Sequence, residues 1–139
     1  MKDDNCIFCK IANGEIPSST IYEDEKFRVF LDLGPAAKGH ALVVPKEHYA
    51  DLLEMPEELL GEAFGVAKKT AVRMKAAFAP AGFNIVQNNG LTAGQTVFHF
   101  HIHVIPRYED DGQKIGWNPG NLSPEEAAEI CGKMKDALN

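Results

Sequence analysis

The sequence predicts an α+β fold built on a five-stranded antiparallel sheet, with one long helix between strands three and four and a helix near the C-terminus. Three observations predict it: short strand-like segments separated by turn residues, one long amphipathic segment, and a late segment that opens with a capping signal. Neighbouring segments of this kind pair as antiparallel strands with helices packed on them. The 139 residues suffice for one core, so residues 1–139 are expected to form a single domain.

The elements expected first along the chain are short. The apolar segment Cys6–Ala12 is followed by an Asn-Gly pair and fits one or two helical turns. Ser19–Glu23 and Phe27–Leu31 flank three polar residues, which predicts a hairpin. Ala41–Val44 is the third short strand and ends before a proline.

The long helix is predicted over Pro56–Phe78. Pro56 suits a first helical position, and Glu57 and Glu58 interact favourably with the helix dipole. Apolar residues then recur at steps of three and four, which indicates one buried stripe. The stripe consists of Leu60, Phe64, Ala67, Ala71, Met74 and Phe78.

The remaining elements follow this helix. Phe83–Gln87 is the expected fourth strand, and Val97–Ile105 is the fifth. Ser123–Glu126 is a capping box with proline at the first helical position, and it opens a helix to about Leu138. Cys131 shares the apolar side of that helix with Ala127, Ile130 and Met134, which predicts a core position.

Composition restricts the class of protein. Hydrophobic residues make up 45% and charged residues 24%, as in an ordinary globular protein. The net charge of −6 argues against a protein that coats nucleic acid, although backbone amides could still hold a small anion. No apolar run reaches the roughly 18–20 residues of a membrane span, and the polar N-terminus does not resemble a signal peptide. We therefore expect a cytoplasmic protein that does not bind membranes.

The most informative segment is Phe98–Ile105. In a strand, His99, His101 and His103 would share one face. The other face, which would belong to the core, would carry Phe98, Phe100, Ile102 and Val104. An accidental, solvated row of histidines is the alternative. Clustered histidines more often mark a metal or a catalytic site.

Distance distinguishes those two kinds of site. His99 and His103 would lie about 13 Å apart along a regular strand, so one zinc ion with bonds of about 2 Å could not bind all three imidazoles. At least one histidine is then free for chemistry, and His101 has a histidine on either side. A neutral imidazole is a good nucleophile toward phosphorus at neutral pH.

The loop before this strand favours a phosphate. Asn88, Gly94, Gln95 and Thr96 combine a close backbone approach with neutral donors. A plain flexible connection would be the interpretation of this loop alone. Beside a row of histidines, a phosphate cradle is favoured.

Cys6 and Cys9 provide half of a tetrahedral zinc site. The alternatives are two reduced thiols or a redox pair, although the second lacks the surrounding thioredoxin-like unit. With only three cysteines, the chain does not suit a secreted disulfide scaffold. His48, which follows the third strand, would by itself be interpreted as a surface loop residue.

The order His-Phe-His-Ile-His-Val-Ile matches the signature of the histidine triad (HIT) proteins, which alternate histidine with apolar residues. The chain resembles this family over most of Cys6–Arg107. The further segments that carry the resemblance are Phe30–Asp32, Lys38–His48, Asn84–Asn88 and Gly94–Phe98.

The resemblance implies a nucleotide hydrolase or transferase that acts at an α-phosphate, with a five-stranded sheet and usually a two-fold dimer. His101 matches the nucleophile that forms a nucleotidyl-histidine intermediate, and His103 matches the residue that contacts the phosphate. Asp32 matches the carboxylate that binds the ribose hydroxyls, and His40 matches a fourth histidine that supports the triad. The phosphate or leaving group would be held by Asn88, Gln95 and Thr96.

The chain is also similar to the zinc-containing subset of the family and to galactose phosphate uridylyltransferase. The zinc ligands of those proteins match Cys6, Cys9, His48 and His99 of this chain, which would form a structural site.

We therefore expect a homodimeric hydrolase that removes a purine nucleotide of the AMP type from a phosphoramidate. A diadenosine polyphosphate hydrolase is the alternative enzyme, and a nucleotide-binding scaffold with little turnover is the alternative outside catalysis. Trp117 lies among glycines and prolines in the C-terminal tail, where it could contact a partner or the rim of the site.

Overall fold

A computed structural model describes residues 1–137 of the chain. It confirms the predicted sheet, whose strands lie in the order β1-β2-β3-β5-β4 with every neighbouring pair antiparallel. The elements are α1 (Ile7–Ala12), β1 (Thr20–Glu23), β2 (Phe27–Leu31), β3 (Ala41–Pro45), a 3-10 turn at Leu52–Glu54, α2 (Glu57–Phe78), β4 (Gly82–Val86), a 3-10 turn at Leu91–Ala93, β5 (Ile102–Arg107) and α3 (Pro124–Asp136).

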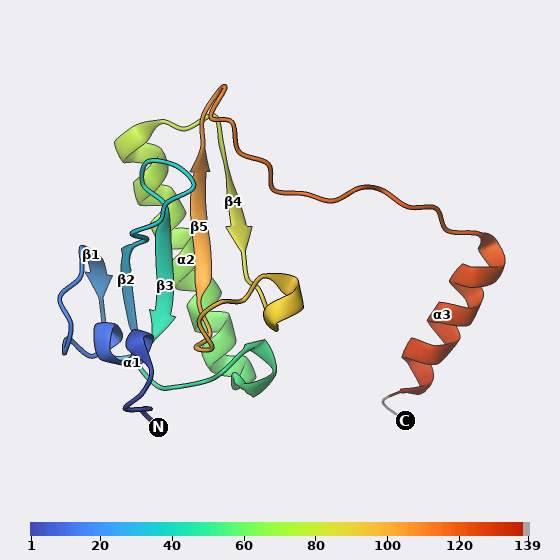
Figure 1. Ribbon diagram of the computed structural model, residues 1–139, viewed down its shortest axis with the longest axis horizontal. Coiled ribbons are helices and arrows are strands. Elements are labelled where there is room, and N and C mark those ends of the chain that lie inside the picture. Colours follow the sequence, from blue (N-terminus) through green and yellow to red (C-terminus); the bar gives the residue numbers. More distant parts are fainter. Residues whose placement is uncertain (138–139) are drawn as a thin grey trace.

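Helix α2 covers one face of the sheet (Figure 1). Its buried side is made mainly of small residues, which let the helix approach the strands closely. The buried residues are Ala63, Val66, Ala67, Thr70, Ala71 and Met74. The predicted stripe is therefore only partly correct, because Phe64 and Phe78 are exposed at its outer edges. No helix of the described residues has the length and apolar character to cross a membrane.

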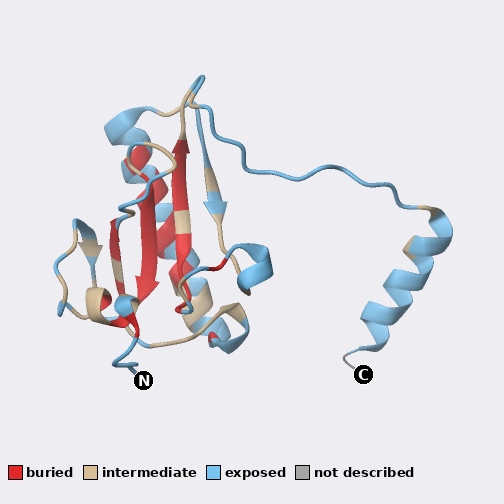
Figure 2. Cartoon of the chain, viewed as in Figure 1, coloured by how far each residue is buried: buried red, intermediate tan, exposed pale blue. Residues whose placement is uncertain are grey.

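The opposite face of the sheet carries the short helix α1. Phe30 and Leu42 pair across β2 and β3 and pack with Ala12 on this side, whereas Val29 and Val43 face α2. The central strands β3 and β5 are mostly buried, whereas the edge strands β1 and β4 are exposed or intermediate (Figure 2). The face with α1 is the one that carries His101.

Strand β5 is shorter at its start than the sequence predicts. It begins at Ile102, and the preceding residues run alongside the sheet without joining the ladder. The backbone N–H of Phe100 donates instead to the carbonyl of Tyr49, at 2.6 Å. Phe100 is fully buried, but Phe98 is half exposed, so its predicted place in the core is wrong.

The C-terminal helix forms as predicted, but it packs on none of the core. Ser123 accepts a hydrogen bond from the backbone N–H of Glu126, as a capping box requires. Helix α3 stands apart from the sheet at the end of an extended arm (Figure 1), and Cys131 is exposed, so the predicted core position is wrong. The predicted end at Leu138 lies outside the described residues.

Candidate active site and metal site

A pocket of about 610 Å³ opens on the face of the sheet that carries α1. Its walls are mainly apolar and include a few polar side chains, which is the usual composition of a small-molecule site. Four of the predicted site residues line it: Asp32, Thr96, His101 and His103.

His101 presents an unprotonated nitrogen to this pocket. Its Nδ1 lies 2.7 Å from the carbonyl oxygen of His99, so Nδ1 carries the proton and donates it. The lone pair is then on Nε2, which the tautomer leaves free to attack. Burial lowers the pKa of His101 below its ordinary value, which keeps the ring neutral. The edge contact with Phe8, at 5.0 Å between ring centroids, fixes the ring's orientation.

His40 and His103 form a second ordered pair. The backbone N–H of Ala36 donates to Nδ1 of His40 at 3.0 Å, so the proton of neutral His40 must be on Nε2. That Nε2 lies 3.0 Å from Nδ1 of His103, which therefore accepts. His103 in turn carries its proton on Nε2. Burial lowers the pKa of His103 to about 4, so it offers a neutral N–H donor at physiological pH.

Asp32 stands at the edge of the pocket, directly after β2. One carboxylate oxygen accepts from the backbone N–H of Gly34 at 2.8 Å, and the other lies 3.5 Å from Nε2 of His40. The loop that joins β2 to β3 thus holds both side chains, and the N–H of Asp32 donates to the carbonyl of His40 across it. Gly39 closes the loop with φ +98, where a Cβ would come within 3.0 Å of Phe78.

The loop after β4 is ordered mainly by Gln95. Its Oε1 accepts from the backbone N–H of Gly90 at 2.8 Å, and its Nε2 donates to the carbonyl of Ala50 at 2.7 Å. The Gln95 side chain is fully buried and lies outside the pocket lining. Gly94 adopts φ +102 and packs against Asn88. The phosphate role expected for Asn88, Gly94 and Gln95 stays a prediction, and their contacts in the structure are those of loop formation.

Two cysteines and two histidines meet on the other side of His101. The ligand atoms of Cys6, Cys9, His48 and His99 all lie within 4.8 Å of one another. Nδ1 of His99 is 3.3 Å from Sγ of Cys6 and 3.4 Å from Sγ of Cys9, and Nδ1 of His48 is also 3.4 Å from Cys9. A tetrahedral zinc ion would place sulfur and nitrogen ligands about 3.5 Å apart. This donor set therefore fits a metal.

Protonation supports this arrangement. Nε2 of His99 lies 2.8 Å from the carbonyl of Pro45 and donates to it, which leaves the lone pair on Nδ1 facing the two sulfurs. Burial lowers the pKa of His99 to about 4, so this ring is neutral. Burial also raises the pKa of Cys9 to about 11, which means that a thiolate here needs a compensating cation.

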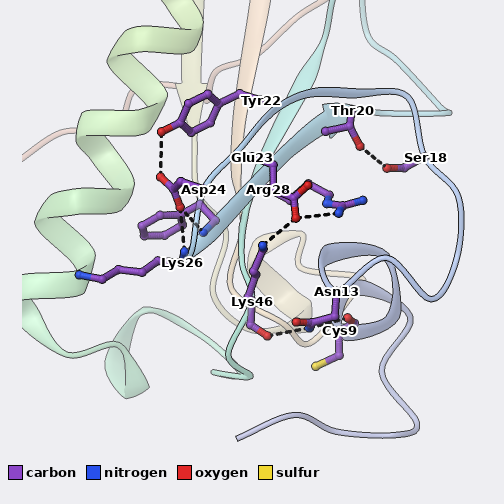
Figure 3. Close-up of polar contacts among 11 residues, drawn as sticks. Cys9, Asn13, Ser18, Thr20, Tyr22, Glu23, Asp24, Lys26, Arg28 and Lys46 are labelled. Atoms are coloured by element: carbon purple, nitrogen blue, oxygen red, sulfur yellow. Dashed lines mark hydrogen bonds and ion pairs between the residues drawn. The ribbon is translucent and has the colours of Figure 1, made fainter.

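Helix α1 is held in position by Asn13 (Figure 3). Its side-chain amide donates to the carbonyl of Cys9 at 2.8 Å and to that of Lys46 at 3.0 Å, which ties the end of α1 to the segment after β3. Lys46 and Arg28 both bind the carboxylate of Glu23 nearby. These contacts bring Cys9 beside His48, two residues beyond Lys46.

A second group of possible ligands does not fit a metal. Asp32, His40 and His103 also have ligand atoms within 4.8 Å of one another. Nδ1 of His40 accepts a hydrogen bond from the N–H of Ala36, and Nε2 carries the ring proton. His40 therefore has no lone pair to give unless it loses a proton from a neutral ring. This group is a chain of hydrogen bonds.

Several functional groups carry no signal in the sequence. The carbonyl of Pro45 and the N–H of Ala36 set two histidine tautomers, yet any residue supplies such groups. Phe8 was missed because it lies between the two cysteines and was counted only as part of a short apolar helix. The available signal was an aromatic residue inside a Cys-x-x-Cys segment, which could have suggested a ring beside the site.

Comparison with known proteins places this fold and site in a family. A HIT domain model matches residues 13–110, so the chain belongs to the HIT domain family. An uncharacterized HIT-like protein of Methanocaldococcus jannaschii is 55% identical over 131 residues, which are 94% of this chain and 98% of that protein. An adenosine 5'-monophosphoramidase of Schizosaccharomyces pombe is 41% identical over 136 residues, 94% of this chain and 99% of that one.

Solved structures have the same architecture. A HIT family protein from Bacillus anthracis superposes with a TM-score of 0.90 at 45% identity, covering 98% of this chain and 99% of that one. A protein from Streptococcus mutans gives 0.94 at 38% identity, with 99% and 88% covered. A zinc-bound histidine triad protein from Mycobacterium smegmatis gives 0.76 at 34% identity, with 96% and 97% covered.

Proposed function

We propose that this protein hydrolyses nucleoside phosphoramidates, or related AMP conjugates, through a nucleotidyl-histidine intermediate on His101. The observation that carries the proposal is the unprotonated Nε2 of His101, held in the pocket by the donation of Nδ1–H to the carbonyl of His99. The yeast relative named as an adenosine 5'-monophosphoramidase supports the substrate class.

The reaction follows from the protons assigned above. Nε2 of His101 attacks the α-phosphorus as the phosphorus–nitrogen bond to the leaving amine breaks, and the amine departs with a proton from solvent. Nε2–H of His103 donates to a phosphate oxygen and stabilises the charge that develops there. Water then attacks the phosphorus and releases one proton to solvent, the bond to Nε2 of His101 breaks, and AMP leaves. Asp32, which lines the same pocket, would accept hydrogen bonds from the ribose hydroxyls.

The test is mass spectrometry of the purified protein after brief exposure to an AMP phosphoramidate. We expect an adenylyl group on the peptide that contains His101, and none on His101→Ala. Parallel turnover of a diadenosine polyphosphate measures the alternative enzymatic activity. Absence of both adduct and turnover with either substrate, while nucleotide still binds, would favour the scaffold instead.

We further propose that the four-ligand group holds one structural zinc ion. The fit of the sulfur–nitrogen distances and the zinc-bound relative from Mycobacterium smegmatis support this proposal. Zinc would bring the two thiolates and two neutral imidazoles into one rigid unit. Cys6, Cys9, His48 and His99 fill a tetrahedron, so the site has no open position and serves stability.

The functional unit that we propose is a homodimer. Strand β4 is an edge of the sheet, and its Phe83 and Ile85 are exposed. Between β4 and α2 lies an apolar groove of about 340 Å³, which Phe64 and Val72 also line. An exposed apolar edge of this kind favours pairing with a second sheet. Sedimentation of the wild type and of Ile85→Lys tests the dimer, because a charge on this edge should yield monomers.

A further inference from the structure

Cys6 and Cys9 meet the geometric requirement for a disulfide as well as that for a metal site. Cys6 caps the start of α1, and its Sγ accepts a hydrogen bond from the backbone N–H of Cys9 at 3.4 Å. Residues three apart in a helical turn have Cα atoms about 5 Å apart, inside the range of about 4.4–6.8 Å that disulfides span. The two sulfurs lie within 4.8 Å of each other. Joining them therefore requires side-chain rotation and little movement of the backbone.

Two residues that adjoin this cysteine pair contact His101. Phe8 lies between the two cysteines in the chain, and its ring meets that of His101 edge-on at 5.0 Å between centroids. His99 has its Nδ1 at 3.3 and 3.4 Å from the two sulfurs. The backbone carbonyl of His99 accepts a hydrogen bond from Nδ1–H of His101 at 2.7 Å. A change at the two sulfurs therefore reaches His101 by two routes, through α1 and through His99.

Helix α1 also forms part of the wall of the pocket. It has only six residues, whereas an isolated helix is marginal in water below about 12–15 residues, so its position depends on contacts with the rest of the fold. A bound ion would tie it, through Cys6 and Cys9, to the histidines of two other segments. Three apolar residues of this helix line the pocket that contains His101: Ile7, Phe8 and Ile11. Release of the ion would therefore loosen this wall together with the nucleophile.

We propose that Cys6 and Cys9 form a redox switch, in which a hydroperoxide converts the two thiolates to a disulfide, releases the metal ion and slows the reaction at His101. The inference rests on the proposed zinc site and the proposed function, and it adds a regulation of both. Metal coordination keeps a thiol deprotonated, and the thiolate is the form that attacks a peroxide. Cys6 is the more exposed of the two residues, at 9% against 2% for Cys9, so its sulfur reacts first.

The oxidation proceeds in two steps. The thiolate of Cys6 attacks one oxygen of the peroxide, the oxygen–oxygen bond breaks, and the departing oxygen takes a proton from solvent. The thiolate of Cys9 then attacks the sulfenic acid on Cys6, the sulfur–sulfur bond forms, and hydroxide leaves and takes a second proton. The two sulfurs lose two electrons, and hydrogen peroxide gains them and becomes two molecules of water. Only the two imidazoles then remain of four ligands, so the ion is released.

The experiment treats zinc-loaded full-length protein with hydrogen peroxide and removes the excess with catalase. Peptide mapping should find a disulfide between Cys6 and Cys9, and a colorimetric chelator should detect about one released zinc ion per chain. Nitrogen-15 NMR follows His101 without substrate: its proton should be fixed on Nδ1 before oxidation and shared between both nitrogens afterwards. Single-turnover formation of the adenylyl adduct should slow about 10- to 100-fold. Dithiothreitol with zinc should restore every signal.

Cys131→Ser is the matched control, because it removes the exposed third thiol and should respond as the wild type does. Oxidation of the sulfurs without a link between Cys6 and Cys9, or a disulfide that forms while zinc stays bound, would overturn the switch. An unchanged NMR signal of His101 after zinc release would overturn it as well, whether or not the protein hydrolyses phosphoramidates. If the NMR change occurs but the reduced protein never forms an adduct, the proposed function alone fails. Freshly purified protein without zinc would contradict the zinc site and the switch together.

Discussion

Two groups of buried and half-buried side chains flank His101, and the distances within each group do not tell them apart. One consists of Cys6, Cys9, His48 and His99, and the other consists of Asp32, His40 and His103. In the first, the carbonyl of Pro45 accepts a hydrogen bond from Nε2–H of His99, which leaves the lone pair on Nδ1 toward the sulfurs. In the second, the N–H of Ala36 occupies the lone pair of His40 and turns its proton toward His103.

One backbone group therefore separates a metal site from a proton chain. A carbonyl beside a histidine leaves the far nitrogen free to bind a cation, while an amide N–H beside it makes the far nitrogen a donor. Clustering of ligand residues does not distinguish these cases. The hydrogen bond on the far side of each ring does, and it allows the two groups to be tested separately.

The largest effect should come from the residue between the two groups. His101→Ala removes the nucleophile and should lower kcat by about 10⁴-fold or more. Because His101 belongs to neither group, zinc content and nucleotide affinity should stay near the wild-type values. Steady-state hydrolysis of an AMP phosphoramidate and calorimetric nucleotide binding measure the two quantities. Retention of a tenth of wild-type kcat would contradict the assigned mechanism.

The next effect distinguishes the two groups directly. Elemental analysis should find about one zinc per wild-type chain, and Cys6→Ser should lose it. Because metal binding contributes to folding, that variant should melt about 10 °C or more below the wild type. Cys131→Ser is the matched control and should keep its zinc.

The second group should hold no metal. His40→Gln should therefore leave the zinc content at the wild-type value, although it removes the donor to His103. If His40→Gln lost metal, or if a second equivalent bound to the wild type and not to this variant, the hydrogen-bonded chain would be the wrong description. An equally stable Cys6→Ser without metal would contradict the structural zinc.

A smaller effect concerns the sugar. In the proposed complex, loss of the ribose 2′-hydroxyl would remove a hydrogen bond to the carboxylate of Asp32, which costs about 1–3 kcal/mol, or about 5- to 150-fold in kcat/KM. Asp32→Ala should reduce this preference for ribonucleotides over deoxyribonucleotides. Paired kinetics with the two substrates measure it. An unchanged preference would place the sugar elsewhere in the pocket.

The smallest effect is on protonation. Burial lowers the pKa of His103 from 6.5 to about 4. The pKa of His103 is lower in the folded state than in the unfolded state. Its contribution to the free energy of unfolding is therefore fully present above about pH 6.5, and it is lost as the pH falls toward 4. Nitrogen-15 NMR of the imidazoles should find His103 neutral at pH 6, with its proton on Nε2. Titration near pH 6.5, or a proton on Nδ1, would contradict the assignment from Ala36.

The sequence was sufficient to predict the sheet because periodicity reports which face of a short element is buried. Alternation in β2 and β3 and the helical spacing of α2 are local properties. The start of β5 was predicted too early, since the alternation of Phe98 and Phe100 continues where the ladder does not. That boundary depends on Tyr49, a distant residue whose carbonyl accepts a hydrogen bond from the N–H of Phe100.

The residues of the two groups were identified from side-chain type and from the family resemblance. The sequence could not predict which nitrogen of each histidine ring carries the proton. Pro45 and Ala36 act through backbone atoms that every sequence contains. Cys131 was misplaced for a different reason. The apolar side of α3 is real, but sequence patterning does not say whether a helix buries that side against its own chain.

The loop between β2 and β3 carries Asp32, Ala36 and His40 within nine residues. It thus holds the carboxylate that we propose binds the sugar, together with the two groups that set the proton of His103. Surface loops are also the segments in which related proteins differ most in length and sequence. If the proposed roles hold, a change in this one connection would alter the choice of sugar and the N–H donor offered to the phosphate together. Selection acting on either property would then act on both, and an exchange of this loop between relatives would transfer the two traits as one inherited unit.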